Sequence, residues 1–274
     1  MTIIRTIPLP DFGRPEARKA SIFVYAPNMA LAQATRIEPP VGWRAEGTPV
    51  FRAVDGANLA LVRADLIAEG QRFVVGSPAT IHTDDCDYRV NLTSDCLTLW
   101  RLAGPFDAGA VDTLDMAVSA MERAITAAKN GIELPETRDY LGLATSGYVN
   151  LTAFLENIWG PVPSGDYRVW KRSSLASTFV RSGSETDALL EIKGEDRFAL
   201  WVNEQPLRRL ESSPRLVPAR IPLQLRKGWN RLRIASVQDA TREWGGRRWG
   251  FEARLLTAAG RSLPDLQISI NREA

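Results

Sequence analysis

The chain has 274 residues, of which 45% are hydrophobic and 24% are charged, a composition typical of a folded globular protein and not of a disordered one. It contains no run of about 20 apolar residues, the length that a membrane-spanning helix needs. Its net charge of +2 is small compared with the basic surfaces of nucleic-acid-binding domains. We therefore expect neither a membrane nor a nucleic acid as a partner.

The N-terminal residues lack the continuous apolar segment of a secretory signal. We expect a cytoplasmic protein, or a secreted one if a signal peptide has been removed. The two cysteines, Cys86 and Cys96, and the single histidine, His82, are too few for an ordinary zinc site. A disulfide between the cysteines stays open, although free thiols are usual in a cytoplasmic protein.

Charge is distributed unevenly along the chain. The segment from Glu204 to Ala274 holds 14 Lys/Arg and 7 Asp/Glu, which leaves the preceding residues with a net charge of −5. A basic region of this kind favours an anionic ligand through its local field. The alternative, which we favour at this stage, is that the arginines cover exposed faces of strands.

Residues 1–99 are predicted to form a β-rich unit of short strands. Turn signals such as Asp55-Gly56 separate segments rich in β-branched and aromatic residues. The predicted strands are residues 21–27, 49–54, 59–66, 72–77, 88–93 and 96–104. Strands at this spacing, without alternating helices, are typical of a sandwich or a barrel.

One amphipathic helix is predicted at Asp112–Asn130. Its apolar residues recur at three- and four-residue steps, and Gly131 provides a stop. The apolar side chains are Leu114, Ala117, Val118, Met121, Ile125 and Ala128. We expect this helix to pack on a sheet of its own fold, and docking of a partner is the alternative.

Strands return after Tyr148. The clearest alternation lies near the C-terminus, where Leu223 and Leu225 precede a turn, and Trp249, Phe251, Ala253 and Leu255 share one face of a later strand. The other predicted strands are residues 167–172, 177–182, 188–193, 198–203 and 230–236. Trp229 and Trp249 are expected in the core, whereas Trp201 alternates with Phe198 and Leu200 and is expected to face the other way.

Several of these segments occur in the order seen in a known family. They are Trp100 with Gly104-Pro105-Phe106, Gly147–Leu151, Phe179–Ser182, Leu189–Leu207, Lys227–Leu232, Trp249-Gly250-Phe251, and the closing Gly260, Leu263-Pro264 and Leu266. Over about residues 100–266 the chain resembles the galactose-binding-like jelly-roll domains appended to bacterial glycoside hydrolases and polysaccharide lyases. The family's acidic Gly-rich turn loses its second glycine here, at Gly194–Phe198.

The strand pattern and the resemblance together predict a fold, and the resemblance, which does not extend over residues 1–99, implies a role. The fold class is all-β, with two β-sandwich (jelly-roll-like) units and one inserted amphipathic helix. The first domain is residues 1–99, and the second is a galactose-binding-like jelly roll over residues 100–274 with a helical insertion at about 107–146. The role is non-catalytic carbohydrate binding or support of a catalytic partner chain or domain in a glycan-processing enzyme.

The loop Asp239–Arg248 is the ligand site expected from the residues. Arg242, Trp244, Arg247 and Arg248 lie there beside two glycines. Tryptophan can stack on the C–H face of a sugar, and arginine can bind its hydroxyls or carboxylates. The expected ligand is therefore a carbohydrate, including anionic ones, and the alternative is a solvated loop.

Signals for catalysis and cofactors are weak. A standalone glycoside hydrolase or lyase with an unrecognised carboxylate site is the alternative function, since a carboxylate pair can be assembled from distant residues. No nucleotide-binding motif is present. No cofactor is expected; a structural calcium at His82–Asp87 is the one candidate, against the ordinary interpretation of a solvated turn.

Overall fold

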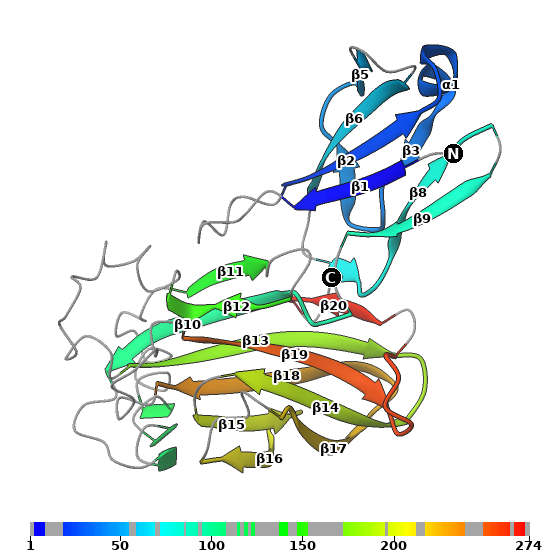
Figure 1. The fold of residues 1–274 in the computed structure, drawn as a ribbon. Coiled ribbons are helices and arrows are strands. Elements are labelled where there is room, and N and C mark those ends of the chain that lie inside the picture. The colour runs from blue at the N-terminus through cyan, green and yellow to red at the C-terminus, as the bar shows by residue number, and fades with distance from the viewer. Residues whose placement is uncertain are drawn as a thin grey trace.

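A computed structural model shows the chain as an assembly of antiparallel β-sheets (Figure 1). It describes residues 3–8, 19–54, 59–68, 72–84, 86–92, 95–107, 114–115, 118–119, 122–123, 137–141, 147–152, 172–194, 197–211, 217–238, 249–263 and 266–271. The predicted all-β sandwich class is confirmed.

The N-terminal part contains two sheets. Sheet A has the order β1 (Ile3–Pro8), β2 (Lys19–Ala26), β6 (Leu59–Ala68) and β4 (Trp43–Ala45), with β5 (Val50–Val54) also paired to β6. Sheet B has the order β3 (Arg36–Glu38), β8 (Pro78–His82) and β9 (Asp87–Asn91). Alternate residues of β6 from Ala60 to Ala68 are buried, so one face of sheet A lies on the core.

A short helix, α1 (Met29–Ala34), follows β2 and was not predicted. Asn28 caps it by accepting a hydrogen bond from the backbone N–H of Leu31 at 2.9 Å. Strands β1, β3, β4 and β8 were also missed. β3 and β4 are only three residues long, which is too short for a periodic pattern to be recognised.

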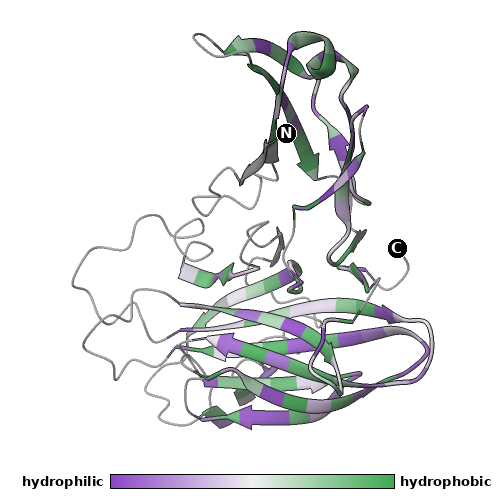
Figure 2. Cartoon of the chain, turned by 45° about the vertical axis from the view of Figure 1, so that its right-hand side comes forward, coloured by the Kyte–Doolittle hydropathy of each residue, from purple (hydrophilic) through white to green (hydrophobic). Residues whose placement is uncertain are grey.

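The C-terminal part is a sandwich of two sheets. Sheet C has the order β11 (Thr137–Leu141), β10 (Leu99–Asp107), β13 (Arg172–Ser182), β18 (Gly228–Val237), β15 (Arg197–Val202) and β16 (Gln205–Leu210). Sheet D has the order β12 (Val149–Asn150), β19 (Gly250–Thr257), β14 (Thr186–Gly194) and β17 (Ala219–Leu225). Hydrophobic and hydrophilic residues alternate along these strands (Figure 2).

Aromatic side chains join the two sheets. The Phe251 ring of sheet D meets the rings of Trp100 and Phe198 of sheet C edge to face, at centroid distances of 5.3 and 6.2 Å. The Trp100 indole N–H donates to the carbonyl of Leu97 at 2.6 Å, which satisfies its polar atom inside the core. The predicted inward face of Trp249, Phe251, Ala253 and Leu255 is confirmed, because all four are buried.

The outer face of sheet C carries a second hydrophobic cluster. It comprises Phe106, Leu114, Val118, Leu175, Ala199, Trp201, Ala235 and Val237. Of the predicted helix, residues 114–115, 118–119 and 122–123 are described, and all are helical. Leu114 and Val118 are buried, so the helix packs on its own sheet as predicted. Its Asp115 forms an ion pair with Arg209 of β16.

The tryptophan predictions are confirmed in two cases. Trp201 is 7% exposed and lies in the cluster under the helix, whereas Phe198 and Leu200 face the sandwich core. Trp249 is buried, and its indole N–H donates to the Ser236 hydroxyl at 2.9 Å. Trp229, predicted in the core, is only partly buried because it lies near the first residue of β18, beside the turn.

Two chain paths differ from the predictions. Residues 189–207, which match one continuous segment of the family pattern, divide between the two sheets: β14 belongs to sheet D, and β15 and β16 form a hairpin in sheet C. Its turn, Asn203-Glu204, has positive φ at both residues, 49° and 69°, the arrangement that matches the twist of two adjacent strands. In addition, strand β11 lies inside residues 107–146, which were predicted as a helical insertion.

The N-terminal part and the sandwich are joined by two short strands, one from each part. β20 (Gln267–Ser269) pairs with β13 of the sandwich on one side and with β7 (Arg72–Val74) on the other. One continuous hydrophobic core runs from Ile22 and Leu66 of sheet A to Ile234 and Phe251 of the sandwich. The division into residues 1–99 and 100–274 stays a prediction, and Leu97, Leu99 and Trp100 on either side of it belong to this core.

Candidate functional site

A pocket of about 490 Å³ opens at one end of the sandwich. Three connections meet there: the β13–β14 turn, the β17–β18 turn and the segment between β19 and β20. Its lining combines cationic, hydroxyl, amide and apolar groups. The lining residues are Arg181, Ser182, Gly183, Ser184, Thr186, Lys227, Gly228, Leu263, Leu266 and Gln267.

Asn230 fixes the β17–β18 side of the pocket. Its side-chain amide donates to the carbonyls of Arg226 and Gly228 at 2.8 and 3.0 Å, and its oxygen accepts from the Arg226 backbone N–H at 2.8 Å. The same oxygen accepts from the Asn203 amide at 2.8 Å, which ties this turn to the β15–β16 hairpin. Gly228 adopts φ +93°, a conformation that glycine takes without strain.

Hydroxyl groups organise the β13–β14 side. The Ser182 hydroxyl donates to the Ser184 carbonyl at 2.7 Å and lies 3.1 Å from the Thr186 hydroxyl. The Ser184 and Thr186 hydroxyls are 3.3 Å apart. Gly183 between them leaves open space where a side chain would stand. The turn therefore presents a cluster of hydroxyl groups beside an unobstructed backbone.

The charge of the pocket is positive. Arg181 and Lys227 are exposed, and the Arg181 guanidinium donates to the side-chain carbonyl of Gln267 at 3.3 Å. None of the described residues that line the pocket is acidic. Leu263 and Leu266 supply apolar surface. The described lining residues can bind a polyol or an anion, and they include no carboxylate for general acid catalysis.

The predicted site residues are not among those that form this pocket. Arg242, Trp244, Arg247 and Arg248 lie outside the described residues. The flanks of their loop are described, and Gln238 and Trp249 lie at the opposite end of β18 and β19 from the pocket. The pocket could not be predicted from the sequence, because its residues come from three connections that are distant along the chain.

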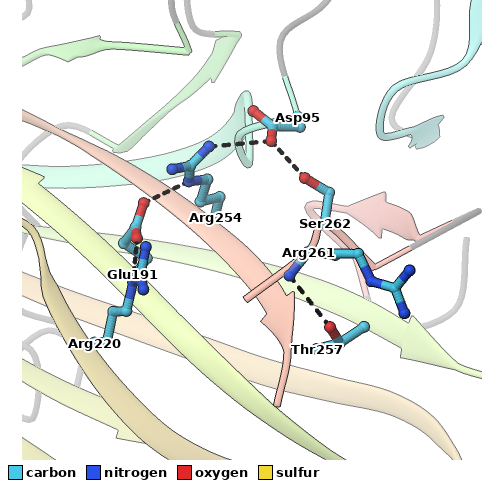
Figure 3. Close-up of polar contacts among 7 residues, drawn as sticks. All are labelled: Asp95, Glu191, Arg220, Arg254, Thr257, Arg261 and Ser262. Carbon is cyan, nitrogen blue, oxygen red and sulfur yellow. Dashed lines mark hydrogen bonds and ion pairs between the residues drawn. The ribbon is translucent and has the colours of Figure 1, made fainter. Parts of the chain in front are cut away.

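A second polar cluster lies on sheet D and at its edge (Figure 3). Glu191 of β14 stands opposite Arg220 of β17 and Arg254 of β19 in the strand registers. Both arginines donate to its carboxylate, at 2.7 and 2.5 Å. Arg254 also reaches Asp95 at 3.2 Å, and the Ser262 hydroxyl donates to Asp95 at 2.5 Å.

This cluster is built for structure and not for acid–base chemistry. The Glu191 side chain is 5% exposed. Burial raises the pKa of Glu191, but the hydrogen bonds from Arg220 and Arg254 outweigh it and hold the pKa below its usual value. A carboxylate kept ionised between two guanidinium groups is a poor proton donor at neutral pH. These ion pairs and hydrogen bonds instead link strands β14, β17 and β19 to one another and to the segment before β10.

The segment His82–Asp87 forms ion pairs within sheet B. The His82 ring nitrogens lie 2.8 Å from Asp87 and 3.3 Å from Glu38, and these contacts raise the pKa of the imidazole. The described residues contain no group of three or more His, Cys, Asp or Glu side chains arranged to hold a metal ion. Asp85 lies outside the described residues, so calcium binding there stays a prediction.

The states of the two cysteines and the lengths of the helices can also be compared with the predictions. Cys86 and Cys96 are both free thiols, the first exposed and the second buried. Within the part of the chain that is described, no helix is both long enough and apolar enough to span a membrane.

Comparison with known proteins gives no family. No family model matches the chain, and no curated protein matches it. Among solved structures, a β-glucosidase from Kluyveromyces marxianus aligns with a TM-score of 0.34 and 12% identity, over 58% of this chain and 16% of that one. This chain therefore covers about a sixth of that enzyme's length.

Two further solved structures align with low scores. An anti-sigma factor domain-containing protein from Clostridium clariflavum aligns with a TM-score of 0.33 and 8% identity, over 92% of this chain and 85% of that one. An α-xylosidase from Xanthomonas citri aligns with a TM-score of 0.25 and 7% identity, over 97% of this chain and 23% of that one. At these scores none of them supports an argument about function.

Proposed function

We propose that this protein binds carbohydrate without cleaving it, at the pocket between the β13–β14 and β17–β18 turns. The observation that carries the proposal is the lining of that pocket: clustered hydroxyls, an amide and two cations around an apolar patch, with no acidic residue among the described lining residues. Sugars present hydroxyls for the polar groups and C–H faces for the apolar ones. The galactose-binding-like jelly roll expected from the sequence would serve the same role.

The cations favour an acidic sugar. Arg181 and Lys227 both line the pocket with the hydroxyl cluster, so a uronate carboxylate could pair with either while its ring hydroxyls contact Ser184 and Thr186. As an accessory protein it would support a glycan-processing enzyme carried on another chain or domain. The predicted loop residues Arg242, Trp244, Arg247 and Arg248 remain candidates for a second contact region.

Calorimetric titration with galacturonate, glucuronate and galactose tests the proposal. We expect the two uronates to bind more tightly than galactose, and the double substitution Arg181→Ala with Lys227→Ala to remove that preference. Thr186→Val, which replaces a hydroxyl by a methyl group of similar size, should weaken all three. Lys193→Ala on the outer face of sheet D is the matched control and should change nothing. Failure of all three sugars to bind would refute the proposal.

A hydrolase or lyase is the competing function. Incubation of the purified protein with acidic and neutral polysaccharides, followed by assay of new reducing ends or unsaturated products, separates the two. We expect no turnover. Release of oligosaccharides by the chain alone would overturn the non-catalytic role.

A further inference from the structure

The outer face of sheet C next to the pocket is rich in arginine and aromatic residues. Val180, Leu232 and Ile234 face the sandwich core, so the residues that alternate with them lie on the opposite side of the sheet. The resulting surface, here called the arginine face, consists of Phe179, Arg181, Trp229, Arg231, Arg233 and Gln267. Each of these residues is at least partly exposed.

The strand registers arrange this surface in rows. Arg181 stands opposite both Trp229 and Gln267, and Phe179 stands opposite Arg231. The Arg231 guanidinium lies 5.8 Å from the centre of the Phe179 ring, and that of Arg233 lies 5.3 Å from the centre of the Trp201 ring. Since Arg181 and Gln267 also line the pocket, the face and the pocket are continuous.

Two guanidinium groups of this face already bind a carboxylate. Glu204, in the β15–β16 turn, contacts Arg231 at 3.2 Å and Arg233 at 2.6 Å. The Nε atoms of both arginines are buried and have no hydrogen-bond partner within the described structure. The bridging carboxylate shows that the spacing of these arginines suits an anion.

The charge of the face is not balanced. The face carries three arginines, Arg181, Arg231 and Arg233, and Glu204 pairs with two of them. Glu122 of the packed helix is the other acidic residue close enough to raise the pKa of Arg233. Burial lowers the pKa of Arg233, Glu204 raises it, and the positive charge of Arg231 lowers it, so two cations lie close together at this site. An added anion would relieve that repulsion.

We propose that the arginine face binds an extended acidic polysaccharide whose end occupies the pocket. The inference rests on the proposed function and extends it from a single sugar to a chain of uronates. Carboxylates along the chain pair with Arg231 and Arg233, and sugar rings stack on Trp229 and Phe179. A single-stranded nucleic acid could use similar contacts, but the pocket's hydroxyl cluster and the chain's net charge of +2 favour the glycan.

The test compares hexagalacturonate, its fully methyl-esterified form and monomeric galacturonate by calorimetric titration. We expect the acidic hexamer to bind at least about tenfold more tightly than the monomer and the neutral hexamer to lose this gain. Arg231→Ala with Arg233→Ala should abolish the gain and leave the monomer affinity unchanged. Lys193→Ala is the matched control for loss of one positive charge.

Glu204→Gln gives an independent measurement that does not depend on removing packed arginines. It eliminates the competing carboxylate and should raise hexamer affinity several-fold while the monomer affinity stays constant. Thermal unfolding verifies that each variant is folded. Monomer binding without any gain for the acidic hexamer overturns this inference and leaves the proposed function intact, whereas binding of neither overturns the proposed function. Tighter binding of oligothymidylate than of hexagalacturonate also overturns the inference.

Discussion

At the scale of single residues, Asn230 shows how one side chain fixes two turns. It is buried and uses its amide to satisfy backbone groups of the β17–β18 turn and the side chain of Asn203. Asn203 in turn accepts a hydrogen bond from the Arg231 backbone N–H at 3.0 Å. The geometry of the pocket therefore depends on a residue that does not line it.

Asn230→Ala should lower the free energy of unfolding by about 2–4 kcal/mol, because several buried donors and acceptors lose their hydrogen-bond partner. Each such group that water cannot reach costs about 1–3 kcal/mol. Urea denaturation measures the change. Gln224 is an exposed amide on β17, the strand that precedes β18 in the chain, and serves as the control. Gln224→Ala should change the free energy of unfolding by less than about 0.5 kcal/mol. Equal effects of the two substitutions would contradict this account.

His82 gives the protein a pH-dependent contact in sheet B. The hydrogen bonds to Asp87 and Glu38 raise its pKa above 6.5, so the protonated form is favoured by folding. This stabilisation is fully present below pH 6.5 and is lost as the pH rises through the folded pKa. Because His82 is the only histidine, its NMR titration can be followed directly, and we expect a midpoint above 6.5. His82→Gln should flatten the dependence of the melting temperature on pH in this range.

At the scale of elements, the inserted helix owes its place to packing and not to charge. Leu114 and Val118 are buried against the outer face of sheet C, whereas the Asp115–Arg209 ion pair is largely exposed. Leu114→Ala should cost about 2–4 kcal/mol of unfolding free energy, and Asp115→Asn less than about 1 kcal/mol. Chemical denaturation of both variants distinguishes the contributions. A larger loss from Asp115→Asn would show that the ion pair holds the helix.

The elements that the sequence predicted are those with long periodic patterns. The helix and strands β2, β6, β18 and β19 each repeat an apolar residue over several turns or pleats, and the pattern alone identifies them. The sheet to which each strand belongs, and the strands that it pairs with there, could not be predicted in this way. The crossing from β14 to β15 resembles a hairpin in sequence, because two strands separated by a short polar segment look alike whether they pair together or join opposite sheets.

The candidate site was still less accessible to prediction. Its residues come from turns around Gly183 and Gly228 and from the segment at Leu263–Leu266, and only the closed sandwich brings them together. The sequence did place arginines on exposed strand faces near the C-terminus. It could not show that Arg231, Arg233 and Arg181 share one face, since Arg181 reaches that face through strand pairing across about 50 residues of chain.

At the scale of the whole molecule, the N-terminal sheets and the sandwich share one core. The β7–β20 pair joins them, and Ile268, the central residue of β20, is completely buried. We expect differential scanning calorimetry to show a single unfolding transition. Ile268→Asp should lower its temperature by burying an unpaired charge. Two separated transitions in the unmodified protein would show instead that the parts unfold independently.

The position of β20 also affects how the chain can fold during synthesis. About 190 residues of chain separate β7 from β20, so β20 leaves the ribosome long after β7. Until then β7 and the part of β13 that pairs with β20 both expose backbone groups that lack their strand partner. A nascent chain stalled before Gln267 would therefore present two unpaired sheet edges to chaperones.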